Sequence, residues 1–290
     1  METIHTVRWM KEVATESLVN ERPLGLVPTM GALHEGHFSL VREAKRKCSP
    51  VVVSIFVNPK QFGPAEDLKK YPRTFESDRE ALANLGVDFL FAPSTEEMYP
   101  AGFSTTVTVK GPGDRWEGRA RPGHFDGVAT VVLKLFEIVR PQVAFFGRKD
   151  AQQARVIQQM VMDLNLDPQI DLCPIVRESD GLALSSRNVY LSADDRRAAT
   201  AISRSLAACK EKIEDGERDV AQLLVTMRGK LESEPRLSVD YADIVDVNTF
   251  EPVRALCGNC YALIAAKVGA TRLIDNALIA QDSDAFRVTL

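Results

Sequence analysis

Residues 28–37 read Pro28-Thr29-Met30-Gly31-Ala32-Leu33-His34-Glu35-Gly36-His37, between an apolar run at 24–27 and a helical pattern over 38–47. A turn from a buried strand into a helix exposes unpaired backbone N–H groups and the positive end of the helix dipole. Such turns bind phosphate in α/β proteins. Two glycines let a ligand approach the backbone, and two histidines three residues apart share the first helical turn. We therefore predict a polyphosphate site at this turn.

Short apolar runs alternate with helical patterns through the first 176 residues. Runs that are apolar throughout are typical of parallel strands buried on both faces. Alternation of this kind predicts an α/β fold, a Rossmann-like doubly wound parallel sheet. The predicted strands cover 24–27, 51–57, 87–91, 105–109, 143–146 and 170–176, and the predicted helices cover 38–47, 77–85, 127–139 and 150–164.

The pattern changes after residue 188. Long amphipathic helices are predicted over 192–214, with Ser192 as N-cap and Gly216 beyond the end, and over 218–233. Three strand-like runs follow at 239–247, 261–267 and 271–277. We predict two domains: a nucleotide- and substrate-binding domain over 1–176 and a smaller α+β C-terminal domain over 177–290.

Composition narrows the class of protein. The 290 residues include 36 basic and 40 acidic side chains, a net charge of −4, which gives no electrostatic basis for binding nucleic acid. The longest strongly apolar run, 51–57, is too short to span a membrane. Five scattered cysteines fit a reducing compartment, and the pair Cys257 and Cys260 does not lie at a strand-to-helix turn that would indicate a redox motif. We expect a cytoplasmic protein with no membrane partner.

Polar residues follow three of the predicted strands. In open α/β sheets, ligands bind outside the carboxyl ends of the strands, so residues 58–61, 147–150 and 177–188 are expected to share one crevice with the histidine turn. Lys149 offers a compact cation for phosphate and Asp150 a carboxylate for ribose hydroxyls. Each segment alone also fits an ordinary capped helix start or polar loop. A zinc site at His34 and His37 lacks further ligands in the sequence.

Several motifs together carry a resemblance. His34-x-Gly36-His37 after a first strand is similar to the motif of the nucleotidyltransferase superfamily, which includes class I aminoacyl-tRNA synthetases. The whole chain resembles the pantothenate synthetase family, in order and spacing, through five further blocks. These blocks are Phe56-Val57-Asn58-Pro59-Lys60-Gln61-Phe62, Tyr71-Pro72-Arg73-Thr74, Arg121-Pro122-Gly123-His124-Phe125, Phe146-Gly147-Arg148-Lys149-Asp150 with Gln152 and Gln153, and Leu184-Ser185-Ser186-Arg187-Asn188.

The resemblance implies an ATP-dependent ligase that joins (R)-pantoate to β-alanine and releases AMP and pyrophosphate through a pantoyl adenylate. It implies His37 as proton donor and His34, Lys149 and Arg187 as catalytic partners, with Gln61 and Gln153 holding pantoate and Gln61 also near β-alanine. It also implies Mg²⁺ and a homodimer, for which residues 58–74 are a candidate contact. The implied ATP contacts are Met30, Gly31, Ala32, Leu33, His34, Glu35, Gly36, His37, Gly147, Arg148, Lys149, Asp150, Val176, Leu184, Ser185, Ser186 and Arg187.

Two positions depart from the family pattern, and other functions stay open. Arg148 stands where many relatives carry Glu, and Leu184 where Met is common. The sequence offers no dense carboxylate cluster, so magnesium is expected on the ATP phosphates, with Asp78 a weak candidate ligand. The alternatives are a noncatalytic nucleotide-binding regulator, a nucleotidyltransferase whose product retains the nucleotide, and a class I synthetase, for which no RNA-binding domain is visible.

Overall fold

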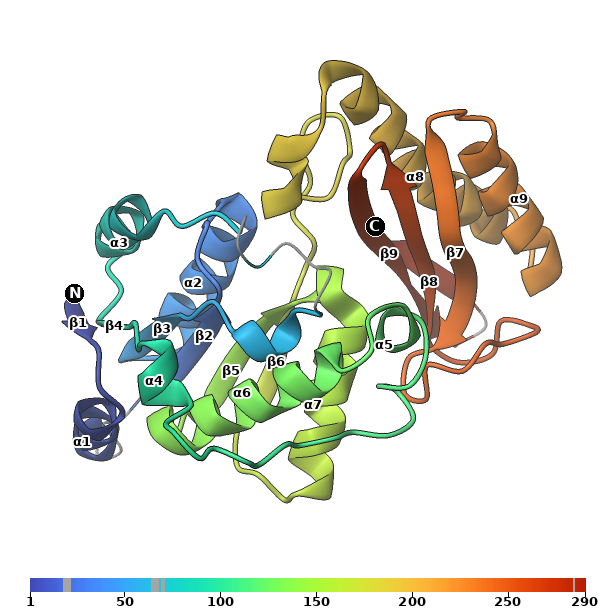
Figure 1. Ribbon diagram of the computed structural model, residues 1–290. Helices are drawn as coiled ribbons and strands as arrows, with labels where there is room; N and C mark the ends of the chain where they lie inside the picture. Colours follow the sequence, from blue (N-terminus) through green and yellow to red (C-terminus); the bar gives the residue numbers. More distant parts are fainter. Residues whose placement is uncertain (18–21, 64–67, 69–70, 284) are drawn as a thin grey trace. The chain divides into compact units, whose positions relative to one another are not determined.

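The computed structural model describes residues 1–17, 22–63, 68, 71–283 and 285–290. Residue contacts divide the chain into two compact units, shown in Figure 1. The first unit comprises 1–148 and 152–174, and the second comprises 149–151 and 175–290. Among the described residues, no helix is both long and apolar enough to cross a bilayer.

The first unit is built on a six-stranded sheet with the strand order β1-β4-β3-β2-β5-β6. Every pair of neighbouring strands is parallel. The predicted doubly wound parallel sheet is therefore confirmed. The strands are β1 (Glu2–Ile4), β2 (Gly25–Thr29), β3 (Val51–Ile55), β4 (Phe89–Phe91), β5 (Val143–Gly147) and β6 (Gln169–Cys173).

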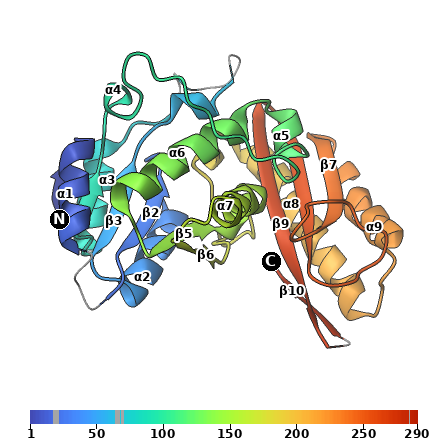
Figure 2. The ribbon, with the colours of Figure 1, turned by 90° about the horizontal axis from the view of Figure 1, so that it is seen from below.

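Helices cover both faces of this sheet (Figure 2). Successive strand side chains point to opposite faces. Accordingly, Leu26 and Phe146 pack with α1, α6 and α7, whereas Val27 and Phe145 pack with α2 and α3. The helices of the first unit are α1 (Val7–Ser17), α2 (Glu35–Lys47), α3 (Phe75–Asn84), α4 (Thr95–Met98), α5 (Glu117–Ala120), α6 (His124–Val139) and α7 (Ala151–Asp163), with short 3₁₀ turns η1 (Pro59–Gln61) and η2 (Arg148–Asp150).

Strand β2 is the point where the strand order reverses. It pairs with β3 on one side, through Val27 and Val53, and with β5 on the other, through Leu26 and Ala144. Connections leave a reversal point in opposite directions, which leaves a crevice outside the carboxyl ends of the two strands. The histidine turn follows β2 at this position.

The second unit pairs two helices with a four-stranded antiparallel sheet, in the order β10-β9-β8-β7. The predicted cap is confirmed, since Ser192 Oγ accepts the N–H of Asp195 at 3.1 Å, and Gly216 follows α8 with a φ of +102°. The sequence predicts three strands here, and the structure has a fourth, β10. The elements are η3 (Ser186–Tyr190), α8 (Ala193–Glu214), α9 (Val220–Glu232), β7 (Leu237–Asp246), β8 (Cys260–Val268), β9 (Thr271–Asp282) and β10 (Ala285–Thr289).

The first unit departs from the prediction at several places, and the short helices α4 and α5 were also not predicted. The predicted strand at 105–109 is wrong, because the N–H of Val107 donates to Thr130 Oγ1 on α6 at 2.9 Å and the segment joins no sheet. Strand β1 and helix α1 were not predicted, since their charged residues interrupt the apolar pattern. Helix α2 begins at Glu35 rather than at residue 38, because His34 caps it.

A glycine in α6 tests the packing of this helix against η1. A Cβ on Gly127 would lie 2.2 Å from the carbonyl oxygen of Lys60, which is backbone and cannot rotate away. We expect Gly127→Ala to destabilise the protein by about 1–3 kcal/mol, despite the better helix propensity of alanine. The matched control is Gly229→Ala in α9, where a Cβ meets nothing within 4 Å. Thermal unfolding should show a lower melting temperature for the first variant and an equal or higher one for the second; equal melting temperatures would contradict the packing.

Candidate active site

His34 and His37 bind each other at the start of α2. His34 is the N-cap residue, and its Nδ1 accepts the N–H of Gly36 at 3.2 Å. The Nδ1 of His37 accepts the N–H of His34 at 3.3 Å, and the two ring centroids lie 4.1 Å apart. An accepting Nδ1 carries no proton, so each neutral ring keeps its proton on Nε2. Both imidazoles are thus set up to donate from the distal nitrogen.

The N–H groups of the preceding loop are bound within the protein. Thr29 Oγ1 accepts the N–H of Gly31 at 3.2 Å. The carboxylate of Asp78 accepts the N–H of Ala32 at 2.9 Å and that of Leu33 at 3.0 Å. The expectation of unpaired N–H groups is therefore wrong for these three loop residues. These three amides are therefore engaged within the protein.

Asp78 shapes the loop from helix α3. Its side chain is only 4% exposed, and Oδ2 also accepts the Thr74 hydroxyl at 3.0 Å. Gly31 and Ala32 have φ values of +81° and +52°, a conformation rare for a residue with a side chain. The hydrogen bonds that Asp78 accepts from Ala32 and Leu33 hold this turn. Within the described ranges, no three His, Cys, Asp or Glu side chains gather as a metal-binding group.

Gln61 is oriented by the fully buried Asn58. Asn58 Nδ2 donates to Gln61 Oε1 at 2.8 Å and to the carbonyl of Gly127 at 3.0 Å. Its Oδ1 accepts the Tyr99 hydroxyl at 2.9 Å and the N–H of Lys60 at 3.2 Å. A carbonyl only accepts and a backbone N–H only donates, so the Asn58 amide has one possible orientation. Gln61 therefore directs its Nε2, a donor, away from Asn58.

The backbone of Gln61 is held by the block that begins at Arg121. Arg121 Nη1 lies 3.1 Å from His124 Nε2. Because a guanidinium only donates, Nε2 accepts and the neutral ring carries its proton on Nδ1. His124 Nδ1 lies 2.9 Å from the carbonyl oxygen of Gln61, which also accepts from Arg121 Nη2 at 3.3 Å. Side chain and backbone of Gln61 are both fixed.

Gln152 on α7 binds the backbone of residues 112–117, the segment that precedes the block beginning at Arg121. Its Nε2 donates to the carbonyls of Pro112 and Arg115, both at 2.7 Å, and its Oε1 accepts the N–H of Glu117 at 3.0 Å. The side chain is 5% exposed. Gln153, the predicted substrate contact, is the next residue and is half-buried. Sequence reasoning assigned the substrate role to one glutamine and missed the structural role of the other.

Strand β5 ends at Gly147, where a Cβ would meet no atom within 4 Å. In the following turn η2, Arg148 and Lys149 are half-buried and Asp150 is exposed. The carbonyl of Lys149 accepts from Asn276 Nδ2 at 2.9 Å, a contact within the second unit. The predicted phosphate cation is thus tied through its backbone to strand β9.

A hairpin-like loop carries the remaining predicted nucleotide contacts. The N–H of Leu184 donates to the carbonyl of Val176 at 3.0 Å, which brings these two predicted residues together. Ser185 Oγ accepts the N–H of Arg187 at 3.3 Å and caps η3. These residues and Ser186 are half-buried, as expected for groups that remain accessible to a ligand.

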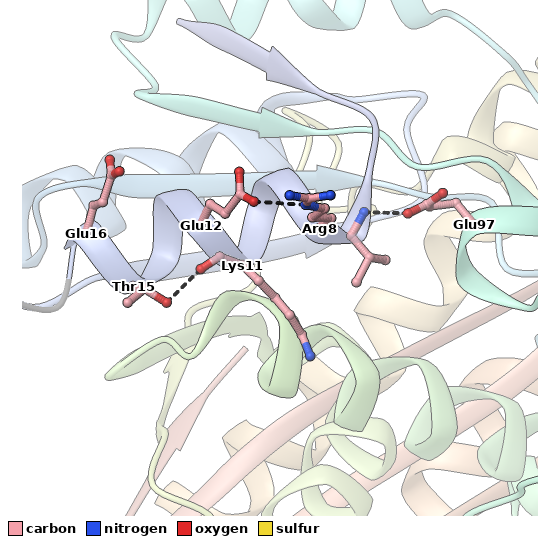
Figure 3. Close-up of a pocket in the computed structure, with 7 residues that line it drawn as sticks. Arg8, Lys11, Glu12, Thr15, Glu16 and Glu97 are labelled. Carbon is pink, nitrogen blue, oxygen red and sulfur yellow. Dashed lines mark hydrogen bonds and ion pairs between the residues drawn. The ribbon is translucent and has the colours of Figure 1, made fainter.

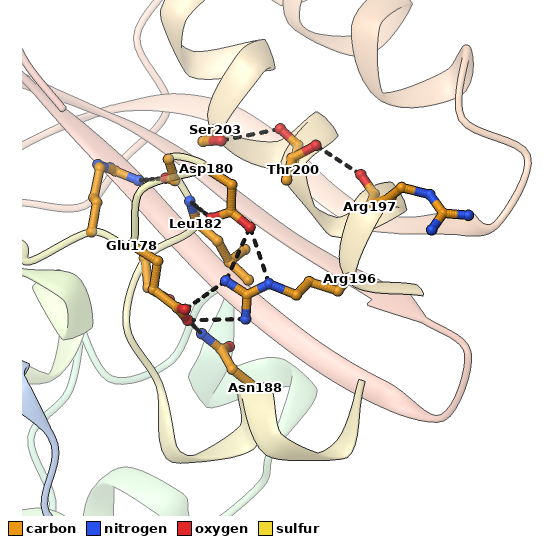
Figure 4. Close-up of polar contacts among 11 residues, drawn as sticks. Glu178, Asp180, Leu182, Asn188, Arg196, Arg197, Thr200 and Ser203 are labelled. Carbon is orange, nitrogen blue, oxygen red and sulfur yellow. Dashed lines mark hydrogen bonds and ion pairs between the residues drawn. The ribbon is translucent and has the colours of Figure 1, made fainter. Parts of the chain in front are cut away.

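A charged network fixes this loop to α8, as Figure 4 shows. Arg196 pairs with Glu178 at 2.5 Å and with Asp180 at 3.0 Å. Asn188 Nδ2 donates to Glu178 Oε1 at 2.9 Å and to the carbonyl of Ala183 at 3.1 Å. The hydrogen bond from Arg196 lowers the pKa of Glu178 below its ordinary value. The carboxylate stays charged and the loop stays anchored at neutral pH.

A separate hollow in the first unit contains none of the predicted site residues (Figure 3). It has a volume of about 780 Å³ and lies along α1. Arg8 pairs with Glu12 at 3.1 Å, and Glu97 Oε1 accepts the N–H of Val7 at 2.6 Å. The residues that line this hollow carry charges of both signs, as on an ordinary solvated helix face. The lining residues are Val7, Arg8, Lys11, Glu12, Thr15, Glu16 and Glu97.

The predicted site residues fall into one set in each unit. The first unit holds the histidine turn with Gln61, Gln153, Gly147 and Arg148, and the second holds Lys149, Asp150, Val176 and residues 184–187. The sequence analysis named Asn58, Arg121, His124 and Gln152 within motifs but gave them no supporting role, and it did not single out the other supporting residues, most of whose partners lie far along the chain. These supporting residues are Asn58, Tyr99, Arg121, His124, Gln152, Glu178, Arg196, Asp275 and Asn276.

Comparisons with known proteins agree over nearly the whole chain. The family model described as pantoate-beta-alanine ligase matches residues 2–278. A pantothenate synthetase from Caldicellulosiruptor saccharolyticus is 51% identical over 279 residues, 96% of this chain and 99% of the relative. The crystal structure of pantothenate synthetase from Thermus thermophilus has a TM-score of 0.90 at 46% identity, over 95% of this chain and 98% of that one.

A ligand-bound relative is also similar. Pantoate-beta-alanine ligase from Francisella tularensis, complexed with beta-gamma ATP and beta-alanine, has a TM-score of 0.78 at 35% identity, over 95% of this chain and 97% of that one. The doubly wound sheet and its capped histidine turn define a nucleotide-binding α/β enzyme. The chain belongs to the pantoate-beta-alanine ligase family, which confirms the predicted family, fold class and ligase activity.

Asp78 can be tested for its role in the loop. Asp78→Asn removes one acceptor oxygen from a carboxylate that binds two backbone N–H groups. One buried N–H then lacks its partner, which we expect to destabilise the protein by about 1–3 kcal/mol. The control is Asp219→Asn, because Asp219 accepts the N–H of Ala221 at the exposed N-cap of α9, and asparagine caps equally well. Chemical denaturation measures the free energy of unfolding of both variants. Equal stability of the two would contradict the role of Asp78 in holding the loop.

Proposed function

We propose that this enzyme condenses (R)-pantoate with β-alanine in two steps. In the first, the pantoate carboxylate attacks the α-phosphorus of ATP, giving pantoyl adenylate and pyrophosphate. In the second, the β-alanine amine attacks the acyl carbon, loses a proton and displaces AMP. The observation that carries the proposal is the capped histidine pair, whose Nε2 donors lie at the reversal point of the sheet. Family membership supports it.

The proposed catalytic residues supply donors and positive charge, with no covalent nucleophile. His34, His37, Lys149 and Arg187 neutralise charge that builds on the phosphates as the pantoate oxygen attacks. Such fixed donors act mainly by electrostatic stabilisation and alignment. His37 is the proposed proton donor, consistent with its unprotonated Nδ1 and its proton-bearing Nε2.

Gln61 and Gln153 are the proposed pantoate contacts, with Gln61 also near β-alanine. Because Asn58 occupies Gln61 Oε1, the side chain offers donors to a ligand. Hydroxyl and carboxylate oxygens accept such donors without requiring a full positive charge. The proposed ATP contacts are Met30, Gly31, Ala32, Leu33, His34, Glu35, Gly36, His37, Gly147, Arg148, Lys149, Asp150, Val176, Leu184, Ser185, Ser186 and Arg187.

Magnesium belongs to the proposal as part of the nucleotide substrate. The ion commonly retains several waters and binds through substrate phosphates. The Asp78 carboxylate already accepts three hydrogen bonds from the protein, which favours Mg²⁺ delivered as MgATP over a dedicated protein site. Its contribution is charge neutralisation on the phosphates.

Domain roles, assembly and location complete the proposal. Residues 1–176 bind nucleotide and pantoate, and residues 177–290 form the smaller domain that contributes the loop ending at Arg187. The enzyme is a cytoplasmic homodimer without nucleic-acid or membrane partners. Residues 58–74 are the candidate dimer contact, of which 64–67, 69 and 70 lie outside the described residues.

The proposal predicts the effect of removing His37. His37→Ala should leave the protein folded and lower adenylate formation by about 100- to 1000-fold, the usual loss when one transition-state donor is removed. Cys257→Ser, at an exposed thiol, is the control and should behave like the wild type. AMP release with ATP, Mg²⁺ and pantoate, with and without β-alanine, measures both, and pantothenate is identified by mass spectrometry. Wild-type rates in His37→Ala would rule out the assigned site.

The same assay separates the alternatives. AMP and pantothenate that appear together only with both substrates support the ligase. A product that retains the nucleotide would indicate a nucleotidyltransferase, and no turnover would indicate a nucleotide-binding regulator.

Tyr99 tests how Gln61 is oriented. Tyr99→Phe removes the hydroxyl that donates to Asn58 Oδ1. A hydrogen bond of this kind contributes about 1 kcal/mol, so we expect the KM for pantoate to rise roughly fivefold. The KM for ATP, measured on the same variant, is the internal control and should not change. An unchanged pantoate KM would contradict the proposed link between Asn58 and Gln61.

A further inference from the structure

Strand β9 carries two buried polar residues whose partners are remote in sequence. Asp275 and Asn276 are 4% and 2% exposed. Strand β10 pairs with β9 only from Leu278 onward, and β8 pairs on the other side. In the described part of the sheet, the segment of β9 before Leu278 is therefore an edge. An unpaired edge can bind other backbone or side-chain groups.

Three hydrogen bonds fix Asn276 at this edge. Its N–H donates to Asp275 Oδ1 at 2.8 Å, and its carbonyl accepts from Arg177 Nη2 at 3.4 Å. Arg177 also pairs with the Asp275 carboxylate at 2.7 and 3.0 Å, a two-point contact with well-defined geometry. The third bond runs from Asn276 Nδ2 to the carbonyl of Lys149 at 2.9 Å.

We infer that Asn276 is a positioning residue for the ligation reaction, acting through Lys149. The ammonium of Lys149 can neutralise phosphate charge only where its backbone places it. The turn η2 is three residues long, so a bond to the Lys149 carbonyl restrains the point from which the side chain extends. A displacement of about 1 Å in a catalytic group can lower a rate by about 100-fold. The inference rests on the proposed role of Lys149.

A double-mutant cycle tests the inference. Asn276→Ala, Lys149→Ala and the double variant are compared in the full-length enzyme by kcat/KM for ATP in the AMP-release assay. We expect Asn276→Ala alone to lower kcat/KM at least tenfold and to have little further effect once Lys149 is alanine, because coupled residues are not additive. A purely structural role would give the same loss in both backgrounds.

Two further variants guard against a folding artefact. Asn276→Asp keeps the side-chain volume but replaces the Nδ2 donor with an oxygen that cannot donate to the Lys149 carbonyl, so the same coupling is expected. Ser205→Ala is the matched control, because Ser205 is fully buried and its Oγ donates to the carbonyl of Met227 at 2.9 Å. This control should lower kcat/KM by less than twofold.

Each outcome has one meaning. Suppose that Lys149→Ala is itself impaired. Additive losses in the double variant, or wild-type activity in both Asn276 variants, would then overturn the inference about Asn276 but leave the proposed role of Lys149 intact. Wild-type activity in Lys149→Ala would overturn the proposed role of Lys149, and the inference with it. Loss in Asn276→Ala and Asn276→Asp that disappears in the Lys149→Ala background supports positioning.

Discussion

The carboxylate of Asp78 holds the loop on which the candidate site depends. The loop leaves β2, turns through two residues with positive φ and enters α2 at a histidine cap. A turn of this shape is strained for Ala32, and the two backbone hydrogen bonds that Asp78 accepts offset that strain. The distance and orientation of both imidazoles follow from this geometry, because His34 caps the helix and His37 binds the cap. The carboxylate of Asp78 on α3 thereby determines where the imidazole donors at the start of α2 lie.

The other proposed contacts are fixed in a similar way. Each of two proposed contacts is held by a buried asparagine: the buried Gln61 by Asn58, three residues before it, and the half-buried Lys149 by Asn276, far along the chain. In both pairs the hydrogen bond from the asparagine restrains the proposed contact, at the side-chain oxygen of Gln61 and at the backbone carbonyl of Lys149. A preorganised site of this kind loses little entropy when substrate binds.

Most strands and the longer helices of the sheet core in the first unit were predictable because their periodicity is local, whereas β1, α1, α4 and α5 were not predicted. The buried parallel strands, the histidine turn and the Ser192 cap all follow from neighbouring residues. The strand predicted at 105–109 is wrong because its backbone bond goes to Thr130 on α6, which no local pattern reveals. For the same reason the sequence indicated Gln61 but not the Tyr99 hydroxyl that fixes its neighbour Asn58. Motif resemblance indicated the proposed ligand contacts, whereas the hydrogen-bonded residues that hold them became visible only in the fold.

The backbone amides of the loop already donate to acceptors within the protein, which changes how the proposed phosphate site works. In a site built from backbone N–H groups, a substitution removes little, because every residue type except proline offers the same donor. Here the amides of Gly31, Ala32 and Leu33 are engaged, and the imidazoles of His34 and His37 are the donors at the turn. Donors that belong to side chains can be lost one at a time. At the proposed phosphate site, binding would therefore depend on the identity of residues 34 and 37, and Gly31 serves the geometry of the turn rather than supplying a donor.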